Sequence, residues 1–339
     1  MPGRKQAKVN LIELTKTLVN IPSVTGSEAE IADFLSSYLK RQGFELKEQK
    51  VEGKRRNIFA KLHPSPKVIL CTHMDTVPPF YGAREDESFI YGRGACDAKG
   101  IIACMILAGQ ELSKEGMKEI GLLFVVGEET DSIGAKTAGS LSADSEFIIV
   151  GEPTENKMGS GHKGIVNLKI SAEGKSAHSA FPDLGESAVE KLLDVLLEIR
   201  ALDFKEDPIL GKTVINIGKI GGGLAFNIIA DSASAEVSFR NALSSEEIIE
   251  KVKAVAGQRA RIDVVSQSEP QVLFTVPGFE KVVLPYGTDI PYLRSFGKPL
   301  LLGPGSALVA HTENERIEKK QLFEAVEIYK KIVKMLIRY

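Results

Sequence analysis

Residues 68–78, VILCTHMDTVP, join a short apolar run to a histidine and an aspartate, and this stretch decides the expected fold. An apolar run of this length is typical of a strand that is buried on both faces. His73 and Asp75 lie two residues apart at its end, so in an extended chain both side chains point to one face. His73 is the better metal ligand, and Asp75 is better placed to hold the other imidazole nitrogen. Taken alone, the two could also be a chance pair at a strand end.

Four further segments also end an apolar run with residues of a metal-ligand type. They are YGRGACDAKG (91–100) with Asp97, LLFVVGEET (122–130) with Glu128 and Glu129, FIIVGEP (147–153) with Glu152, and LVAHTENE (308–315) with His311. Each has an ordinary alternative, such as a helix N-cap for Asp97 or a solvated loop for the adjacent glutamates. Together, two imidazoles and several carboxylates can hold two divalent ions side by side, which activate a water and polarise a carbonyl.

The spacing of apolar residues predicts alternating helices and strands in the first part of the chain. Helical spacing covers residues 11–21, 27–43 (with a capping box from Ser27 to Glu30) and 99–112. Short apolar runs at 57–62, 67–71, 121–126 and 146–150 predict strands. We therefore expect an α/β fold, with a mainly parallel sheet and helices on both faces. In such a sheet the carboxyl ends of the strands form the site.

Near Gly164 the pattern changes to strict alternation, with two helices expected at about 185–201 and 245–256. Strand-helix-strand-strand-helix-strand is the order of a small α+β sandwich. After about residue 276 the chain returns to the first style and ends in a helix from 318 onward. The simplest account is a domain of residues 1–163 and 276–339, with residues 164–275 inserted into it.

Composition narrows the class of protein. The 339 residues are 43% hydrophobic and 26% charged, with a net charge of -2 and no block of basic residues, so a nucleic-acid partner is not expected. The basic N-terminus lacks the apolar core of a signal peptide, and no stretch reaches the ~20 apolar residues that span a bilayer. Three cysteines argue against a disulfide framework. We expect a cytoplasmic protein without a membrane partner.

The segments together resemble the dinuclear zinc amidohydrolase and peptidase family that contains acetylornithine deacetylase, succinyl-diaminopimelate desuccinylase, aminoacylase and glutamate carboxypeptidase. The similar motifs are HMDTVP (73–78), GRGACDAKG (92–100), GEE (127–129), GEPT (151–154) and AHTENE (310–315). They occur in the family's order and span essentially the whole chain. The resemblance is closest to the acetylornithine and acyl-lysine deacetylases.

The resemblance implies two Zn²⁺ ions per subunit, with Co²⁺ as an alternative metal. Asp97 would bridge the ions, His73 and Glu152 would complete one of them, and Glu129 and His311 the other. Glu128 would be the general base, and Asp75 would orient His73.

The resemblance also gives the inserted domain a role as lid and dimerisation domain of a homodimer. His178 would reach across the dimer to the substrate carbonyl, and Asn227 and Arg240 would help to hold the substrate carboxylate. The alternatives are a surface loop histidine, a turn residue and a surface cation.

The function expected from this resemblance is hydrolysis of the amide bond of an N-acyl amino acid, in arginine or lysine biosynthesis. The substrate would be a small molecule or an amino acid linked to a carrier protein. Alternatives within the enzyme class are a dipeptidase or carboxypeptidase and a succinyl-diaminopimelate desuccinylase. A protein of a different class, a catalytically silent metal-binding scaffold, would have no need of Glu128 beside the ligands.

Overall fold

A computed structural model describes residues 11–141 and 144–339 of the chain. Most of the basic N-terminal stretch considered above precedes Leu11 and lies outside the described residues. The chain forms two compact units. Of the described residues, the first unit comprises 11–141, 144–160, Leu273–Val282 and Thr288–Tyr339, and the second comprises Gly161–Val272 and Val283–Gly287. The return of residues 283–287 to the second unit has no signal in the hydrophobic pattern.

The first unit is built on a six-stranded sheet in the order β1-β2-β6-β3-β7-β15. Its strands are β1 (Glu45–Glu52), β2 (Arg55–Lys61), β3 (Val68–His73), β6 (Ile120–Val125), β7 (Phe147–Val150) and β15 (Lys298–Leu301). The last four in sheet order run parallel, and β1 and β2 add an antiparallel edge. The predicted mainly parallel sheet is therefore confirmed.

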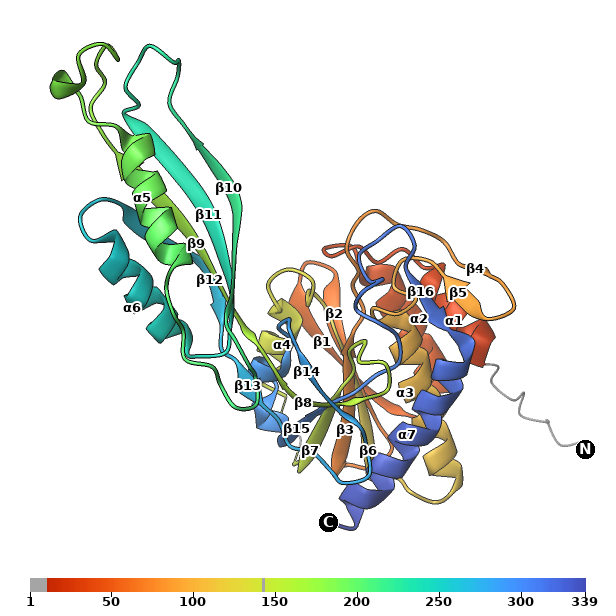
Figure 1. Cartoon of the computed structure of the whole chain (residues 1–339). Coiled ribbons are helices and arrows are strands. Elements are labelled where there is room, and N and C mark those ends of the chain that lie inside the picture. The colour runs from red at the N-terminus through yellow and green to blue at the C-terminus, as the bar shows by residue number, and fades with distance from the viewer. Residues whose placement is uncertain (1–10, 142–143) are drawn as a thin grey trace, which may run out of the picture. The chain divides into compact units, whose positions relative to one another are not determined.

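Helices cover both faces of this sheet, as predicted (Figure 1). On one face, α1 (Leu11–Val19), α2 (Ala29–Arg41), α3 (Lys99–Lys114) and α7 (Lys319–Ile337) share one buried apolar core with the strands. The other face is covered by α4 (Ile133–Ala138) and by the short turns η2 (Ile290–Tyr292) and η3 (Arg294–Phe296). None of the helices in the described ranges is long and apolar enough to cross a membrane.

The start of α2 differs from the prediction. The expected capping box from Ser27 to Glu30 does not form, because the helix begins at Ala29 and the N-cap position is Glu28, whose side chain makes no cap hydrogen bond. The Glu28 carboxylate is fully buried and instead pairs with the Arg55 guanidinium at 2.7 Å. The side chain at the N-cap position is therefore used in a buried ion pair and not in a helix cap.

Two small sheets complete the topology. The first has the order β16-β5-β4, from β4 (Arg84–Glu85), β5 (Phe89–Tyr91) and β16 (Arg316–Glu318). The second, in the order β13-β8-β14, contains β8 (Met158–His162), β13 (Gln271–Val272) and β14 (Lys281–Leu284), where the chain passes between the units. The three cysteines are buried and free, in line with the absence of a disulfide framework.

The second unit follows the predicted strand-helix-strand-strand-helix-strand order. Its elements are β9 (Gly164–Glu173), η1 (Pro182–Leu184), α5 (Ala188–Arg200), β10 (Val214–Gly222), β11 (Ser232–Asn241), α6 (Ser245–Ala256) and β12 (Arg261–Ser268). The sheet order is β10-β11-β9-β12, antiparallel throughout, and α5 and α6 share an apolar core with one of its faces (Figure 1). Ser187 and Ser244 cap the two helices by accepting a backbone N–H bond.

Candidate metal centre

Neighbouring parallel strands place the ligand-type residues at one edge of the central sheet. His73 is the last residue of β3, the two glutamates follow β6 after a short turn, and Glu152 follows β7. Because β6, β3 and β7 are adjacent and parallel, their carboxyl ends meet at this edge. The ligand-type residues that the sequence places at the ends of these strands therefore lie at one edge of the sheet.

Asp97 lies between the two predicted histidine ligands. Its Oδ1 is 3.0 Å from Nε2 of His73, and its Oδ2 is 3.4 Å from Nε2 of His311. Nε2 of His311 is also 2.9 Å from Oε2 of Glu129. Ligand atoms of His73, Asp97 and Glu129 all lie within 4.8 Å of one another, which is the spacing of a group that can share a metal ion. Asp97 is not a helix N-cap, since Ala98 occupies that position of α3.

Asp75 has a role that the sequence did not reveal. Nδ1 of His73 lies 3.0 Å from the main-chain oxygen of Asp75 but 3.7 Å from its carboxylate, which is beyond hydrogen-bond distance. The carboxylate instead accepts hydrogen bonds from the N–H groups of Gly127, Glu128 and Glu129 and from the hydroxyl of Thr25. The Asp75 side chain therefore anchors the loop that carries both glutamates beside His73.

The charges of the cluster favour bound cations. Burial raises the pKa of Glu128 well above its usual range, and the neighbouring charge of Glu152 raises it further. Burial likewise raises the pKa of Glu152, with the charge of Asp97 adding to the effect. Carboxylates gathered in a buried site repel one another unless a cation or proton intervenes. The donor set of two imidazoles and several carboxylates suits divalent ions of the zinc type.

The neighbouring carboxylates favour the positively charged form of both histidines. Hydrogen bonds to Asp97 and Glu129 raise the pKa of His311 to about 10. Burial lowers the pKa of His73, but the carboxylates of Asp75 and Asp97 outweigh burial and raise it well above its usual value. His311 also has a backbone φ of 63°, in the left-handed region that non-glycine residues seldom occupy. Such strained backbone is typical of residues at functional sites.

The structure brings together only some of the predicted substrate residues of the second unit. His178 and Asn227 are exposed neighbours, since the N–H of Ser179 donates to the Asn227 carbonyl at 3.1 Å. Arg240 lies near the opposite end of β11, eight residues from Ser232, which is about 26 Å of strand. Within one chain, Asn227 and Arg240 therefore cannot hold the same carboxylate.

One acidic residue near the site escaped the sequence-based prediction. Asp289 is 2% exposed, and its charge raises the pKa of both Glu128 and Glu152. Burial raises its own pKa to about 7. Residues 285–292, PYGTDIPY, have neither an apolar run nor a histidine, so nothing in this segment distinguishes Asp289 from a turn residue.

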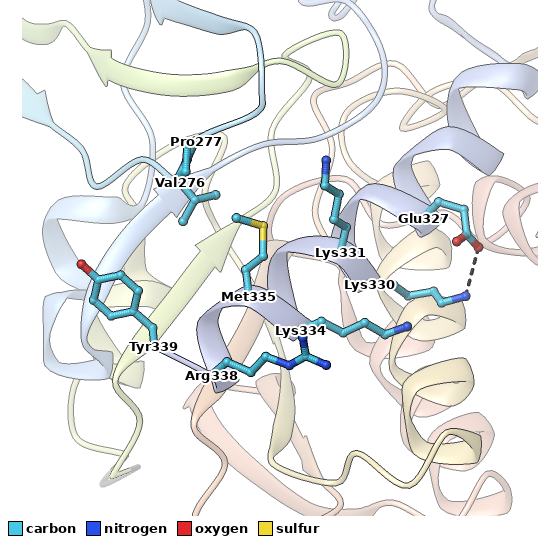
Figure 2. Close-up of a pocket in the computed structure, with 9 residues that line it drawn as sticks. All are labelled: Val276, Pro277, Glu327, Lys330, Lys331, Lys334, Met335, Arg338 and Tyr339. Carbon is cyan, nitrogen blue, oxygen red and sulfur yellow. Dashed lines mark hydrogen bonds and ion pairs between the residues drawn. The ribbon is translucent and has the colours of Figure 1, made fainter.

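A groove of about 640 Å³ lies beside α7 (Figure 2). It is lined by Val276, Pro277, Glu327, Lys330, Lys331, Lys334, Met335, Arg338 and Tyr339. None of the residues of the metal centre lines this groove. The Lys330 side chain that borders it is paired with Glu327 and Glu111. The metal centre, rather than this groove, is the candidate functional site.

Both the sequence and the fold of the chain are similar to those of known proteins. The sequence model of peptidase family M20/M25/M40 matches residues 69–335. A peptidase M20 domain-containing protein of Schizosaccharomyces pombe is 44% identical over 340 residues, covering 96% of this chain and 84% of that protein. An Emericella nidulans protein named "probable carboxypeptidase" is 37% identical over 378 residues, covering 95% and 88%. The solved structure of a tripeptidase from Staphylococcus aureus has the same fold, with a TM-score of 0.82 at 24% identity and coverage of 97% and 98%.

Proposed function

Because the chain belongs to peptidase family M20/M25/M40 and is thus a metal-dependent hydrolase, we propose that it cleaves short peptides, as a carboxypeptidase or dipeptidase does. The observation that carries the proposal is Asp97, whose two carboxylate oxygens face the imidazoles of His73 and His311. The comparisons favour this alternative over the N-acyl amino acid deacylase that was the first expectation, since relatives are named as carboxypeptidases.

The proposed ligands of two Zn²⁺ ions are His73, Asp97, Glu129, Glu152 and His311. When bound, the ions would polarise the scissile carbonyl and lower the pKa of the attacking water. Glu128 lies in the same cluster but is left free by this ligand assignment. It accepts the proton of the attacking water and then delivers that proton to the departing amine. The raised pKa of Glu128, which burial causes, suits this double role.

A homodimer accounts best for the substrate residues of the second unit. Since Asn227 and Arg240 of one chain lie too far apart to hold one carboxylate, the proposal assigns them to different subunits, with His178 accompanying Asn227. The exposed apolar side chains Leu193 and Leu197 on α5, and Val214 and Ile220 on the edge strand β10, support a second copy as partner.

A substrate panel tests the proposed reaction. The protein, loaded with Zn²⁺ or Co²⁺, is offered dipeptides, tripeptides, peptides with a blocked amino group, peptides with a C-terminal amide, and N-acetyl or N-succinyl ornithine, lysine and diaminopimelate. We expect cleavage of peptides that have a free carboxylate and little cleavage of their amides. Cleavage of the N-acyl amino acids alone would restore the deacylase interpretation. No cleavage by protein that holds two ions would contradict both.

A further inference from the structure

A buried ion pair lies directly behind the metal ligands. The antiparallel pairing of β5 with β16 sets Tyr91 opposite Arg316, so Arg93 and Glu315, just beyond these ends, become neighbours. We propose that the Arg93–Glu315 pair is a positioning device, which holds Asp97 and His311 at the spacing that two metal ions need. This inference rests on the metal centre of the proposed function.

The pair binds the main chain of the Asp97 segment through hydrogen bonds. Nη1 of Arg93 donates to Oε2 of Glu315 at 2.6 Å. The other oxygen, Oε1, accepts from the N–H groups of Cys96 and Asp97, both at 3.3 Å. The two carboxylate oxygens therefore act separately, since one binds the guanidinium and the other fixes the backbone of the bridging aspartate.

The pair connects three of the five chain segments that carry the proposed ligands. The N–H of Gly92 donates to the Glu315 carbonyl at 3.0 Å, which ties the Asp97 segment to the segment of His311, four residues before Glu315. The N–H of Arg93 donates to the Tyr81 carbonyl, and its Nε donates to the carbonyl of Pro79. Residues 79–81 directly follow the stretch that begins with His73. A displacement of the pair would therefore move all three segments.

The pair is closed to solvent, so its geometry is well defined. Arg93 and Glu315 are 2% and 1% exposed, and the guanidinium lies 5.4 Å from the centre of the Tyr81 ring. A buried ion pair adds little stability compared with apolar residues of the same volume. The pair contributes a defined geometry, because the planar guanidinium and the two carboxylate oxygens fix each other's orientation.

Glu315→Gln and Arg93→Lys test the proposal in the full-length protein. An amide has one acceptor oxygen, so the side chain that Glu315→Gln introduces cannot serve both Arg93 and the N–H groups of Cys96 and Asp97. Lysine keeps the charge of Arg93, but its single ammonium nitrogen cannot occupy both positions, Nη1 and Nε, from which Arg93 donates to Glu315 and to the Pro79 carbonyl. Leu336→Ala, which removes a fully buried side chain at the far end of α7, is the control for loss of stability alone.

The readouts are the Zn²⁺ affinity of each metal-free protein in competition with a chelator, the absorption spectrum of the Co²⁺ form, and the melting temperature. For Glu315→Gln we expect affinity for one ion to fall about 10–100-fold, with an altered Co²⁺ spectrum. Arg93→Lys should change the Zn²⁺ affinity and the Co²⁺ spectrum in the same direction but to a smaller extent. If Glu315→Gln does not fold, the result for Arg93→Lys tests the positioning role. Leu336→Ala should melt at a lower temperature while it binds metal as the native protein does.

Native Zn²⁺ affinity and a native Co²⁺ spectrum in both variants would overturn the proposal. A loss of Zn²⁺ affinity no larger than that of Leu336→Ala would overturn it as well. These readouts do not depend on hydrolysis. A native protein that binds two ions but cleaves no peptide would therefore contradict the proposed reaction and leave the positioning role decided by the affinities. A native protein that binds no divalent ion would overturn both.

Discussion

The ionisation of His311 links metal binding to pH. Its pKa is raised to about 10 by Asp97 and Glu129, above the ordinary value of 6.5. Because the folded pKa is the higher one, these ion pairs stabilise the metal-free protein fully below about pH 6.5, and the contribution is lost as pH rises toward 10. A metal ion requires the neutral imidazole. We predict that Zn²⁺ binding at about pH 8 releases protons and that affinity rises with pH.

Calorimetric titration in buffers of different ionisation enthalpy measures this proton release. His311→Ala is the control, because it removes one titrating ligand and should release fewer protons. A binding enthalpy that is the same in every buffer would contradict the assignment of His311 as a ligand.

Glu128 and Glu129 are adjacent, but we predict opposite effects of their substitution. Glu128→Gln should lower kcat by about 10²–10⁴-fold while both ions remain bound, because only proton transfer is lost. Glu129→Gln should instead lose affinity for one ion, and its activity should recover in part at high Zn²⁺ concentration. Metal content and kcat, measured together for both variants, check this. Equal rates for native protein and Glu128→Gln would remove Glu128 from the mechanism.

Single residues were predictable where their type and their place in the pattern agreed. His73 ends a buried strand, the two glutamates and Glu152 follow buried strands, and such positions meet at one sheet edge. The anchoring role of Asp75, the site-facing charge of Asp289 and the Arg93–Glu315 pair were not predictable. Each depends on contacts between residues far apart in sequence, and hydrophobic periodicity carries no information about them.

At the scale of elements, strands with a continuous apolar run or a regular alternation were predictable, and β1 was not. β3, β6 and β7 are buried along their whole length, so their sequences are continuous apolar runs. β1, with the sequence ELKEQKVE, lies at the sheet edge and is largely exposed, so it has no such signal. The start of α2 shows a similar limit, because the pairing of Glu28 with Arg55, 27 residues away, has no signal in the local capping pattern.

The cap of α6 gives a prediction at this scale. The Ser244 side chain accepts the N–H of Glu247 at 3.2 Å. Ser244→Ala should lower the free energy of unfolding by about 1 kcal/mol, and Ser244→Asp should preserve it, since aspartate also caps well. Denaturant unfolding of the two variants, followed by circular dichroism, measures the difference. No loss of stability in Ser244→Ala would show that the hydroxyl does not stabilise the helix.

At the scale of the whole molecule, the insertion of one unit into another was visible in the sequence as a change from helical to alternating periodicity. The separation of Asn227 from Arg240 follows from the length of β11, since about 26 Å of strand lies between Ser232 and Arg240. That separation is the reason to expect a second subunit at each site.

We predict that the protein is a homodimer and that Leu197→Glu dissociates it with loss of most activity. Leu197 is 59% exposed on α5. Phe323→Glu is a matched control, since Phe323 is 53% exposed on α7 of the other unit. Light scattering with parallel rate measurements tests this. A fully active monomer would exclude a contribution of His178 from a partner subunit.

The most direct test of the central claim is a Zn²⁺ titration of the metal-free protein, with the rate of cleavage of a dipeptide or blocked peptide as the readout. We predict no activity without metal and a rise to a plateau at two ions per chain. A rate that is independent of added metal, or no cleavage at two bound ions, would contradict the account of His73, Asp97, Glu129, Glu152 and His311 as the metal centre of a peptidase.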